Sequence, residues 1–280
     1  MADHLSRPDA GASERFELAG VDVLVDGAGP DAIVMIHGWP DTHRLWDAQV
    51  AHFRTRHRCV RFTLPGFDLA KPRRAASLDE LVALFRAIVD RVSPDRPVTL
   101  MLHDWGCVFG CEFAARHPGR VARVVSVDVG DHNSPEFRRS LGAGALLGVV
   151  GYQVWNSIAW FLGGAIGDGM MRSMARRRGC PTDPRAIGAQ MGYPYAMRWF
   201  GVAGGLRTIA PVSPPRHPLL YVYGTRRKTK WHSPEWLGVL DRSPGCAHQG
   251  FDTSHWVMID APDAFNACVA RWLEPEARDG

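Results

Sequence analysis

Short apolar runs recur along the chain, and segments with helical periodicity lie between most of them. The runs predicted as strands are residues 21–25, 33–37, 59–64, 98–103, 121–129, 219–223 and 246–251. The predicted helices are residues 77–92, which begin with a Ser-x-x-Glu capping box, then 107–116, a segment beginning at 233–235, and 264–273. Since a short apolar run does not by itself distinguish a strand from a buried helix, the prediction rests on the alternation. It indicates an α/β fold, with a mostly parallel sheet covered by helices on both faces.

The alternation breaks in the middle of the chain. From about residue 131 to residue 212 the sequence has helical segments, glycines and aromatic residues, but no persuasive strand. We therefore expect a helical lid, residues 132–212, inserted into a core formed by residues 1–131 and 213–280. The sequence shows neither an internal repeat nor a low-complexity linker.

One part of this insertion is unusually apolar. Residues 141–167 contain no charged side chain, and a stretch of that length could span a bilayer. The stretch also contains several glycines and the polar residues Gln153, Asn156 and Ser157. We expect apolar helices that face the protein interior or a substrate cavity, in preference to a membrane span. Shallow contact with a membrane surface is the remaining alternative.

Composition and charge narrow the class of protein. The chain has 280 residues, of which 46% are hydrophobic and 22% charged, as in globular proteins. The net charge is +4, and the basic clusters 176–178 and 226–228 are too short to predict nucleic-acid binding. The six cysteines show no metal-binding spacing, which favours free thiols in a reducing compartment. Residues 1–14 lack a signal-peptide pattern, so we expect a cytoplasmic protein, either a monomer or a homodimer.

The stretch LHDWGC, residues 102–107, carries the first candidate chemistry. Asp104 follows a predicted buried strand, and Gly106 permits a tight turn into a helix. A sharp strand-to-helix turn presents one side chain at the carboxyl edge of a parallel sheet, where such proteins bind ligands. A carboxylate in this position can act as a covalent nucleophile. The alternative is that Asp104 only caps the helix, since acids favour helix N-termini.

Two further stretches follow predicted strands. Residues 37–40, His-Gly-Trp-Pro, come after the apolar residues 33–36, and residues 253–256, Thr-Ser-His-Trp, come after the last predicted strand. A lone histidine is more often structural, but His255 is well placed for a base that follows the nucleophile in the chain. No Gly-x-Ser-x-Gly occurs in the sequence, which argues against a serine esterase.

Together, the stretches HGWPDTHRLW, LPGFDLAKP, LHDWGC and SHWVMIDAPDAFN resemble the α/β-hydrolase family. The similar branch has an aspartate nucleophile and contains soluble epoxide hydrolases and haloalkane dehalogenases. The resemblance covers residues 15–131 and 213–274, and the lid matches loosely. It implies the α/β-hydrolase fold, with Asp104 as nucleophile and His255 as the base that activates water. It also implies an oxyanion hole made by the backbone amides of Trp39 and Trp105.

The resemblance indicates how the two reactions of this branch differ. Dehalogenases hold the leaving halide with N–H donors, and Trp105 matches one of these, whereas Trp39 stands where an asparagine is often found. Epoxide hydrolases instead use lid tyrosines, whose phenols polarise the epoxide oxygen. We favour Tyr195 as the catalytic tyrosine. The candidates for substrate binding are His37, Tyr152 and Tyr193.

The acid that orients the histidine departs from the family pattern. The fold usually supplies it from a Gly-x-x-Asp turn after the seventh strand, but residues 224–228 read Gly-Thr-Arg-Arg-Lys. Cations in that place oppose an imidazolium. Some dehalogenases carry the acid after the sixth strand, and that position matches Asp128, with Asp131 as the second candidate. Alternatively, Asp128 only hydrogen-bonds the loop that leads into the lid.

These observations predict a hydrolase that opens a small hydrophobic epoxide through a covalent ester on Asp104, with no metal or organic cofactor. The second hypothesis is a haloalkane or haloacid dehalogenase that uses the same aspartate. The third is a catalytically impaired hydrolase fold that binds an apolar ligand or a partner, since the usual acid is missing. Turnover of any epoxide or halide that disappears in an Asp104→Asn variant would exclude the third hypothesis.

Overall fold

The computed structural model describes residues 14–206, 209–227 and 229–274. The predictions about the N-terminal residues 1–13 and about Lys228 concern residues outside these ranges. The strands are β1 Glu14–Leu18, β2 Val21–Asp26, β3 Ala32–Ile36, β4 Arg58–Phe62, β5 Val98–His103, β6 Val121–Val127, β7 Leu219–Gly224 and β8 Ala247–Phe251. The helices are α1 Asp47–Phe53, α2 Leu78–Val92, α3 Trp105–Arg116, α4 Pro135–Ser140, α5 Ala143–Leu162, α6 Gly164–Arg177, α7 Tyr193–Phe200, α8 Pro234–Asp241, α9 Val257–Asp260 and α10 Pro262–Leu273.

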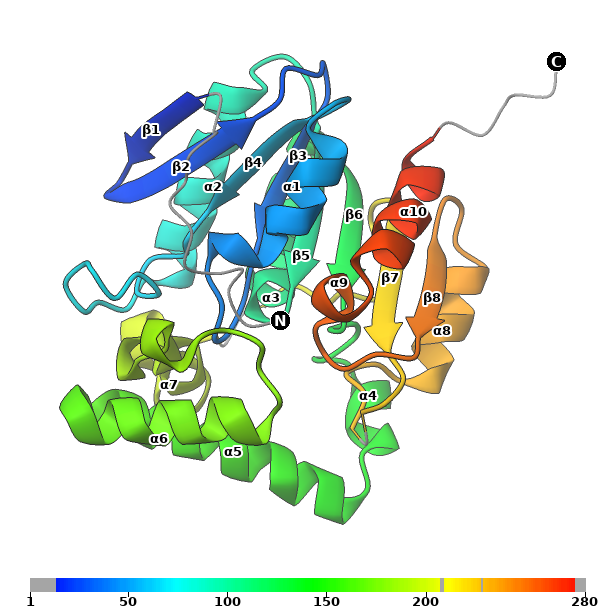
Figure 1. The fold of residues 1–280 in the computed structure, drawn as a ribbon. Helices are drawn as coiled ribbons and strands as arrows, with labels where there is room; N and C mark the ends of the chain where they lie inside the picture. The colour runs from blue at the N-terminus through cyan, green and yellow to red at the C-terminus, as the bar shows by residue number, and fades with distance from the viewer. Residues whose placement is uncertain (1–13, 207–208, 228, 275–280) are drawn as a thin grey trace, which may run out of the picture.

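The strands form one sheet in the order β1-β2-β4-β3-β5-β6-β7-β8 (Figure 1). β2 pairs antiparallel with both β1 and β4, and every other neighbouring pair is parallel. Helices α1, α9 and α10 lie in front of the sheet in Figure 1, and α2 and α3 lie behind it. This architecture agrees with the predicted mostly parallel sheet covered on both faces.

Alternate side chains of the central strands supply two hydrophobic cores. Val34 and Ile36 of β3 belong to the core beneath α2, α3 and α8, whereas Ile33 and Met35 belong to the core beneath α1, α9 and α10. Because both faces of β3 are buried, its sequence is a continuous apolar run without polar alternation. This pattern explains how unbroken apolar runs predicted the central strands.

Local signals fix the ends of several helices. The Ser77 hydroxyl accepts the Glu80 amide at 3.1 Å, and the Glu80 carboxylate accepts the Ser77 amide at 2.7 Å, so the predicted capping box is formed. Ser233 caps α8 by accepting the Trp236 amide at 3.1 Å. The sequence pattern does not predict β1, α1 or α9. All three are short, and the exposed strand β1 lies at the sheet edge.

Helices α4 to α7 follow β6 and precede β7 in the chain, within the segment predicted as the lid. In Figure 1 they lie below the carboxyl ends of the parallel strands. This is the edge of the sheet at which open α/β proteins bind ligands.

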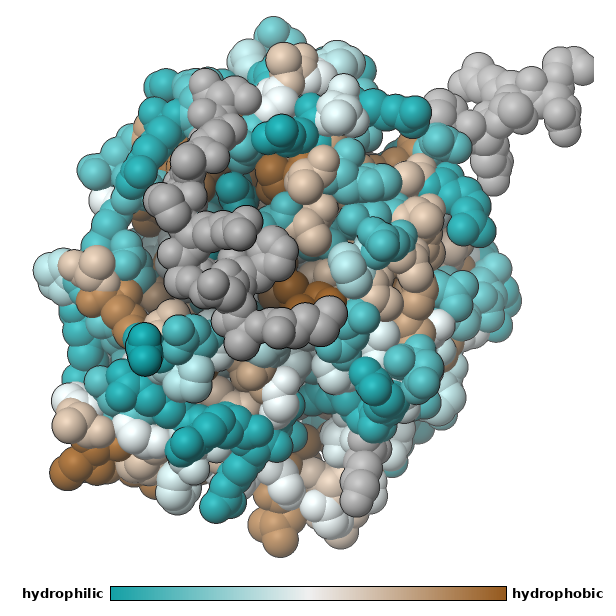
Figure 2. All heavy atoms as spheres, in the orientation of Figure 1, coloured by the Kyte–Doolittle hydropathy of each residue, from teal (hydrophilic) through white to brown (hydrophobic). Residues whose placement is uncertain are grey.

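Helix α5 agrees only in part with the expectation for the uncharged stretch, because Val149 and Val150 line a cavity but several large apolar residues are exposed. By length and composition it is the one helix in the described part of the chain that could cross a membrane, and 22% of its most apolar stretch is buried inside the protein. The buried side of α5 carries Gln153, Asn156 and Ser157, whereas Leu147 is 74% exposed. On this buried side, Gln153 accepts the indole N–H of Trp199 in α7 at 2.9 Å. Figure 2 accordingly shows apolar atoms on the lower edge of the molecule, over the lid helices.

Candidate active site

Asp104 lies in a strained turn between β5 and α3. Its backbone has φ 51° and ψ −121°, a conformation that residues other than glycine rarely adopt. Asp104 occupies the N-cap position of α3, but its side chain makes no capping hydrogen bond. The alternative in which this carboxylate serves as a helix cap is therefore wrong. A strained residue that does not serve its own helix marks a candidate functional position.

Small residues make room for this turn. A Cβ atom on Gly106 would collide with the carbonyl oxygens of Ile36 and His37, and one on Gly38 would collide with Asp104 itself. The loop after β3 therefore packs directly against the turn that carries Asp104. Leu102 fits two positions before Asp104 because Gly110 of α3 leaves space for its side chain. The bulk of Leu102 is thus accommodated within the fold.

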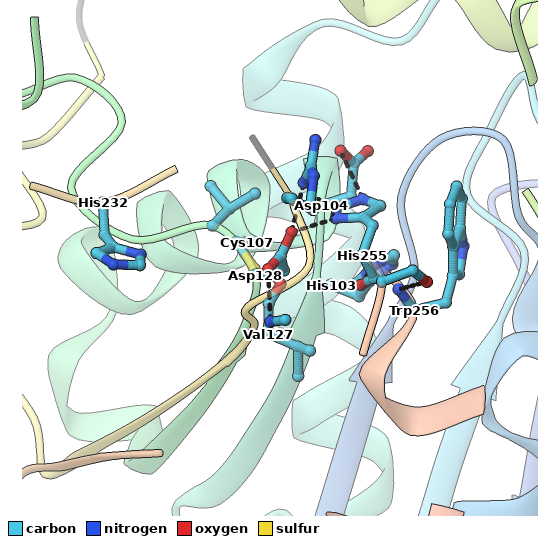
Figure 3. Close-up of polar contacts among 12 residues, drawn as sticks. His103, Asp104, Cys107, Val127, Asp128, His232, His255 and Trp256 are labelled. Atoms are coloured by element: carbon cyan, nitrogen blue, oxygen red, sulfur yellow. Dashed lines mark hydrogen bonds and ion pairs between the residues drawn. The ribbon is translucent and has the colours of Figure 1, made fainter. Parts of the chain in front are cut away.

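His255 bridges two carboxylates. Its Nε2 atom is 3.5 Å from Oδ2 of Asp104, and its Nδ1 atom is 2.6 Å from Oδ2 of Asp128 (Figure 3). Asp128 follows β6 and also accepts the Gly224 amide at 3.0 Å. The second candidate acid, Asp131, instead accepts the Ser233 amide at 2.8 Å and the Ser134 hydroxyl at 2.6 Å. Asp131 is thus bonded to the N-cap residues of two helices, and Asp128 is the acid that contacts His255.

The Trp39 amide points at the carboxylate of Asp104. It donates to Oδ1 of Asp104 at 2.7 Å, and this oxygen would become the carbonyl oxygen of an Asp104 ester. Burial raises the pKa of Asp104, but the hydrogen bond and charge of His255 outweigh this effect, helped by His103 and the Trp105 amide. The pKa of Asp104 therefore lies below its usual value, and the carboxylate is ionised at neutral pH. Of the two amides predicted to form an oxyanion hole, that of Trp39 donates a hydrogen bond to Asp104, and that of Trp105 helps to lower its pKa.

Arg227 occupies the region where the family pattern places an acid. Its guanidinium is paired with the Asp128 carboxylate and lies 2.9 Å from Nδ1 of His255. When Nδ1–H donates to Asp128, a guanidinium N–H cannot donate to the same nitrogen, so Arg227 then acts on His255 through its charge. Burial and the Arg227 cation lower the pKa of His255, but the hydrogen bonds to Asp104 and Asp128 raise it above its usual value.

Replacing Arg227 with glutamine should therefore move the acid limb of the pH–rate profile to higher pH. The base must be neutral to act, so activity falls as the pH drops through the raised pKa of His255. Removing the cation raises this pKa further, because imidazolium then faces Asp128 without a competing charge. The profile of kcat/KM against pH measures the shift. Arg226→Gln is the matched control, since Arg226 pairs with Asp260 at 3.1 Å instead. An unchanged profile in Arg227→Gln would contradict this coupling.

Tyr152 and Tyr195 line the same cavities as Asp104. Their ring centroids are 5.8 Å apart, and both side chains line the cavities that open onto Asp104. Burial raises the pKa of Tyr152 to about 12 and holds the pKa of Tyr195 well above its ordinary value. Both phenols are therefore protonated and can donate a proton or a hydrogen bond.

Two of the residues predicted to bind substrate lie elsewhere. Tyr193 packs edge-on against Phe67, with ring centroids 5.8 Å apart, and lines neither cavity at Asp104. His37 is fully buried, and its Nε2 accepts the Leu64 amide at 2.9 Å while its Nδ1 contacts the Gly38 carbonyl at 2.9 Å. Both ring nitrogens of His37 are used by the backbone, so this residue shapes the loop and cannot face substrate.

Sequence reasoning missed two buried groups around His255. His103 lies beneath it, with ring centroids 4.3 Å apart, and burial lowers the pKa of His103 to about 3, which keeps that ring neutral. Asp41 accepts the indole N–H of Trp256 at 2.9 Å, and this contact holds the residue next to His255. Both residues stand inside quoted stretches, HGWPD and LHDWG, where a polar residue beside an apolar run was the available signal.

Two cavities have Asp104 in their walls. The first has a volume of about 310 Å³ and includes Trp39, His255 and Trp256 in its wall. The second has a volume of about 240 Å³ and is lined mainly by apolar residues of α3, α4 and α5. The residues common to both walls are Asp104, Tyr152, Tyr195 and Trp231. Among the described residues, no group of three His, Cys, Asp or Glu side chains could hold a metal ion.

The chain is similar to known proteins in part of its sequence. Residues 31–147 match the family model described as the alpha/beta hydrolase fold. A Mycobacterium tuberculosis protein named probable oxidoreductase EphD is 37% identical over 113 residues, which are 38% of this chain and 19% of that protein. A Shewanella oneidensis cis-3-alkyl-4-alkyloxetan-2-one decarboxylase is 28% identical over 49% of this chain and 47% of that enzyme. A Mycolicibacterium smegmatis haloalkane dehalogenase is 33% identical over 37% of this chain and 35% of that enzyme.

The likeness of fold extends over nearly the whole chain. A Bacillus megaterium epoxide hydrolase, solved in complex with an inhibitor, superimposes with a TM-score of 0.69 at 18% identity, covering 93% of this chain and 99% of that one. The chain spans about a fifth of the length of the first curated relative it matches. These comparisons confirm the predicted α/β-hydrolase fold. The relatives' names cover several reactions, and a shared fold does not choose among them.

Proposed function

We propose that this chain, an α/β hydrolase by fold, hydrolyses an epoxide to a diol through a covalent ester on Asp104. The observation that carries the proposal is the meeting of three groups at one cavity. They are an ionised carboxylate, a histidine held by a second carboxylate, and two protonated phenols. An epoxide needs these functions: a nucleophile for carbon, a donor for the ring oxygen, and a base for water.

Ring opening is the first step. Oδ2 of Asp104, the oxygen not held by the Trp39 amide, attacks one epoxide carbon while the bond from that carbon to the ring oxygen breaks. The ring oxygen takes a proton from the Tyr195 phenol, with Tyr152 as a second donor. A hydroxyalkyl ester and a phenolate result.

Ester hydrolysis is the second step. His255 takes a proton from water, and the hydroxide attacks the carbonyl carbon of the ester. The charge that develops on Oδ1 is stabilised by the amides of Trp39 and Trp105. The intermediate releases the diol alkoxide, which takes the proton from His255. The Asp104 carboxyl then transfers its proton to the Tyr195 phenolate, which restores both groups.

The indole of Trp39 disfavours the dehalogenase hypothesis. A halide leaving group needs N–H donors turned toward the cavity, but the Trp39 indole N–H donates to Sδ of Met171 at 3.0 Å. The Trp105 indole lies edge-on to Tyr195, with ring centroids 5.2 Å apart. The phenols are the donors that suit an oxygen leaving group, which must be protonated.

A single-turnover experiment tests the proposal. Enzyme in excess over styrene oxide is reacted in heavy-oxygen water, and the diol is weighed by mass spectrometry. Through an Asp104 ester, the first diol carries unlabelled oxygen taken from the carboxylate, and the label enters the protein. Label in the first diol would mean direct attack by water and would contradict the covalent route. A bromoalkane assayed in parallel for bromide release tests the second hypothesis.

Tyr195→Phe should slow ring opening by about 100-fold, since a positioned general acid contributes roughly that much or more. Tyr152→Phe should have a smaller effect if it is the auxiliary donor. Tyr193→Phe is the matched control, because the Tyr193 hydroxyl is buried with no hydrogen-bond partner and lines neither cavity. The rate of ester formation, followed by rapid quench, is the measurement. Equal rates in Tyr195→Phe and Tyr193→Phe would remove Tyr195 from the mechanism.

A further inference from the structure

Large apolar side chains are exposed almost entirely on the lid. Among the described residues, ten such side chains are exposed, and nine of them belong to α5, α6 and α7. Single exposed apolar residues are ordinary on a protein surface, whereas a contiguous group of them marks a contact with another molecule. Six of the nine, on α5 and at the start of α6, define the lid patch: Leu147, Trp155, Ile158, Phe161, Leu162 and Ile166.

One side of α5 carries most of the lid patch. Leu147, Trp155, Ile158 and Leu162 recur with helical periodicity, so they share one face of the helix. Because residues 141–167 contain no charged side chain, this face is apolar along its whole length. Helix α5 lies along the lower edge of the molecule in Figure 1, and Figure 2 shows apolar atoms on the same edge.

The apolar surface continues onto α6 and α7. The Trp155 indole donates to the Met170 carbonyl of α6 at 3.1 Å, and Met170 lies one turn after Ile166. Phe200 of α7 packs edge-on against Phe161, with ring centroids 5.3 Å apart. The exposed apolar side chains of the three helices therefore form one surface.

The lid is more basic than the rest of the chain. Residues 132–212 contain nine arginines, no lysine and three acidic residues, which gives a net charge of +6 against +4 for the whole chain. Glu136 and Asp168 each pair with an arginine of the lid, and Asp183 caps the short helix at residues 184–186. The surplus positive charge of the lid is therefore not neutralised by its own acids.

Several of these arginines border the lid patch. Arg177 is exposed and lies about three turns after Ile166, on the same side of α6. Arg138 and Arg198, which are also exposed, line the second cavity together with the exposed Trp199. None of the described acidic side chains lies within ion-pair distance of these three arginines. An uncharged apolar centre with cations at its border is typical of a protein face that binds an anionic lipid surface.

We propose that the lid patch docks the protein on an anionic lipid surface, with α5 and the start of α6 lying in the interface. The apolar side chains enter the boundary between the headgroups and the acyl chains, and the arginines contact the anionic headgroups. Trp155 and Trp199 suit this depth, because the indole ring is amphipathic. The inference does not depend on the proposed reaction, since binding to a lipid surface needs no substrate.

Two other arrangements fit the lid less well. A membrane span by α5 would place Gln153, Asn156 and Ser157 in lipid, whereas all three are buried against the protein. A symmetric dimer through the lid patch would bring two lids of net charge +6 together, and like charges oppose such an interface. A negatively charged lipid surface suits both the apolar and the basic part of the lid.

Sedimentation with lipid vesicles tests the docking. Wild-type protein should bind vesicles of phosphatidylcholine with about one-third phosphatidylserine, and bind less well to phosphatidylcholine alone or at high salt. Leu147→Gln should weaken this binding about tenfold, because it removes a leucine that the lipid would bury. Leu147→Trp is the conservative variant and should keep the binding. Leu147 is 74% exposed, so neither change disturbs the packing of the lid.

The contribution of charge is tested at the end of α6. Arg177→Gln should lower the affinity for the anionic vesicles about fivefold and leave binding to phosphatidylcholine alone unchanged. Arg271→Gln is the matched control, since Arg271 is also an exposed arginine in the last turn of a helix, but in α10 of the core. Equal losses in the two variants would mean that total charge determines the binding, and would overturn the proposal.

Vesicles with brominated acyl chains distinguish insertion from adsorption. Their bromines should quench tryptophan fluorescence in the bound wild type, and quench it less in Trp155→Phe, which lacks an indole of the lid patch. Binding without quenching, or binding unchanged in Leu147→Gln, would contradict docking through the patch. Absence of binding to the anionic vesicles would overturn the proposal outright. A wild-type dimer that Leu147→Gln separates, seen by analytical ultracentrifugation, would then assign the patch to a second copy of the chain.

Discussion

Replacing His255 with glutamine is expected to stop turnover and leave a covalent ester on Asp104. Glutamine cannot take a proton from water, so hydrolysis of the ester loses its base, a loss worth about 10²–10⁴-fold. The attack on the epoxide does not need that base, because the carboxylate is already ionised: the pKa of Asp104 lies below its usual value. Intact-protein mass spectrometry after mixing with an aryl epoxide should show an adduct of one epoxide mass. A separate reaction with a bromoalkane should show whether an alkyl adduct forms as well.

The adduct is informative because ester hydrolysis needs His255 as its base, whereas ester formation does not. His255 contributes to the low pKa of Asp104, so ester formation should slow somewhat in the variant. An epoxide adduct on a peptide that contains Asp104 would establish covalent epoxide chemistry. An alkyl adduct alone would assign the chain to dehalogenation. Steady turnover in His255→Gln, at a rate near that of wild type, would contradict the assignment of His255 as the base.

Asp104→Asn should abolish both the adduct and turnover. The amide is nearly the same size as the carboxylate and tolerates positive φ, but it is not a nucleophile at neutral pH. We expect a loss of about four orders of magnitude or more, comparable with removal of a nucleophile in other hydrolytic enzymes. Initial rates of diol formation measure the loss. An unchanged thermal unfolding midpoint shows that the fold persists, and residual turnover within tenfold of wild type would rule out Asp104 as the nucleophile.

The central strands and the turn at Asp104 could be predicted from the sequence, each for a physical reason. Strands buried on both faces are continuous apolar runs, and the turn after β5 needs glycine close to Asp104. The triad histidine followed from its position after the last strand. The resemblance favoured Asp128 over Asp131, and Asp128 is the acid that contacts His255 in the structure. Spacing alone would not separate these two acids, because they are close in sequence, and Asp131 instead accepts hydrogen bonds at two helix N-caps.

The lid tyrosines show the limit of a sequence pattern. Tyr193 and Tyr195 are two residues apart at the start of α7, so a helix must point them in different directions. Tyr195 lines the cavities at Asp104, and Tyr193 packs on Phe67. The partner of Tyr195 is instead Tyr152 of α5, far away in the chain. The packing of α5 against α7 brings Tyr152 and Tyr195 together, and a local sequence pattern does not predict such a contact.

The outward face of α5 was unpredictable for a related reason. Gln153, Asn156 and Ser157 favoured a helix that faces the protein interior over a membrane span, and all three are indeed buried, but large apolar residues such as Leu147 are exposed. Periodicity predicts that a helix is two-sided, but it does not say which side meets the protein when small polar residues suit close packing better than large apolar ones.

The positive φ of Asp104 lowers the stability of the folded protein, and this cost bears on the role of the residue. A non-glycine residue at φ 51° costs the folded state about 1–3 kcal/mol, and its buried carboxylate adds a desolvation penalty. Most single substitutions lower stability, whereas glycine here would relieve both costs. If the carboxylate had no function, a substitution of Asp104 by glycine would make the protein more stable at no cost. The cost in stability at Asp104 is therefore one that a function of its carboxylate would offset, which supports the proposed role of this residue.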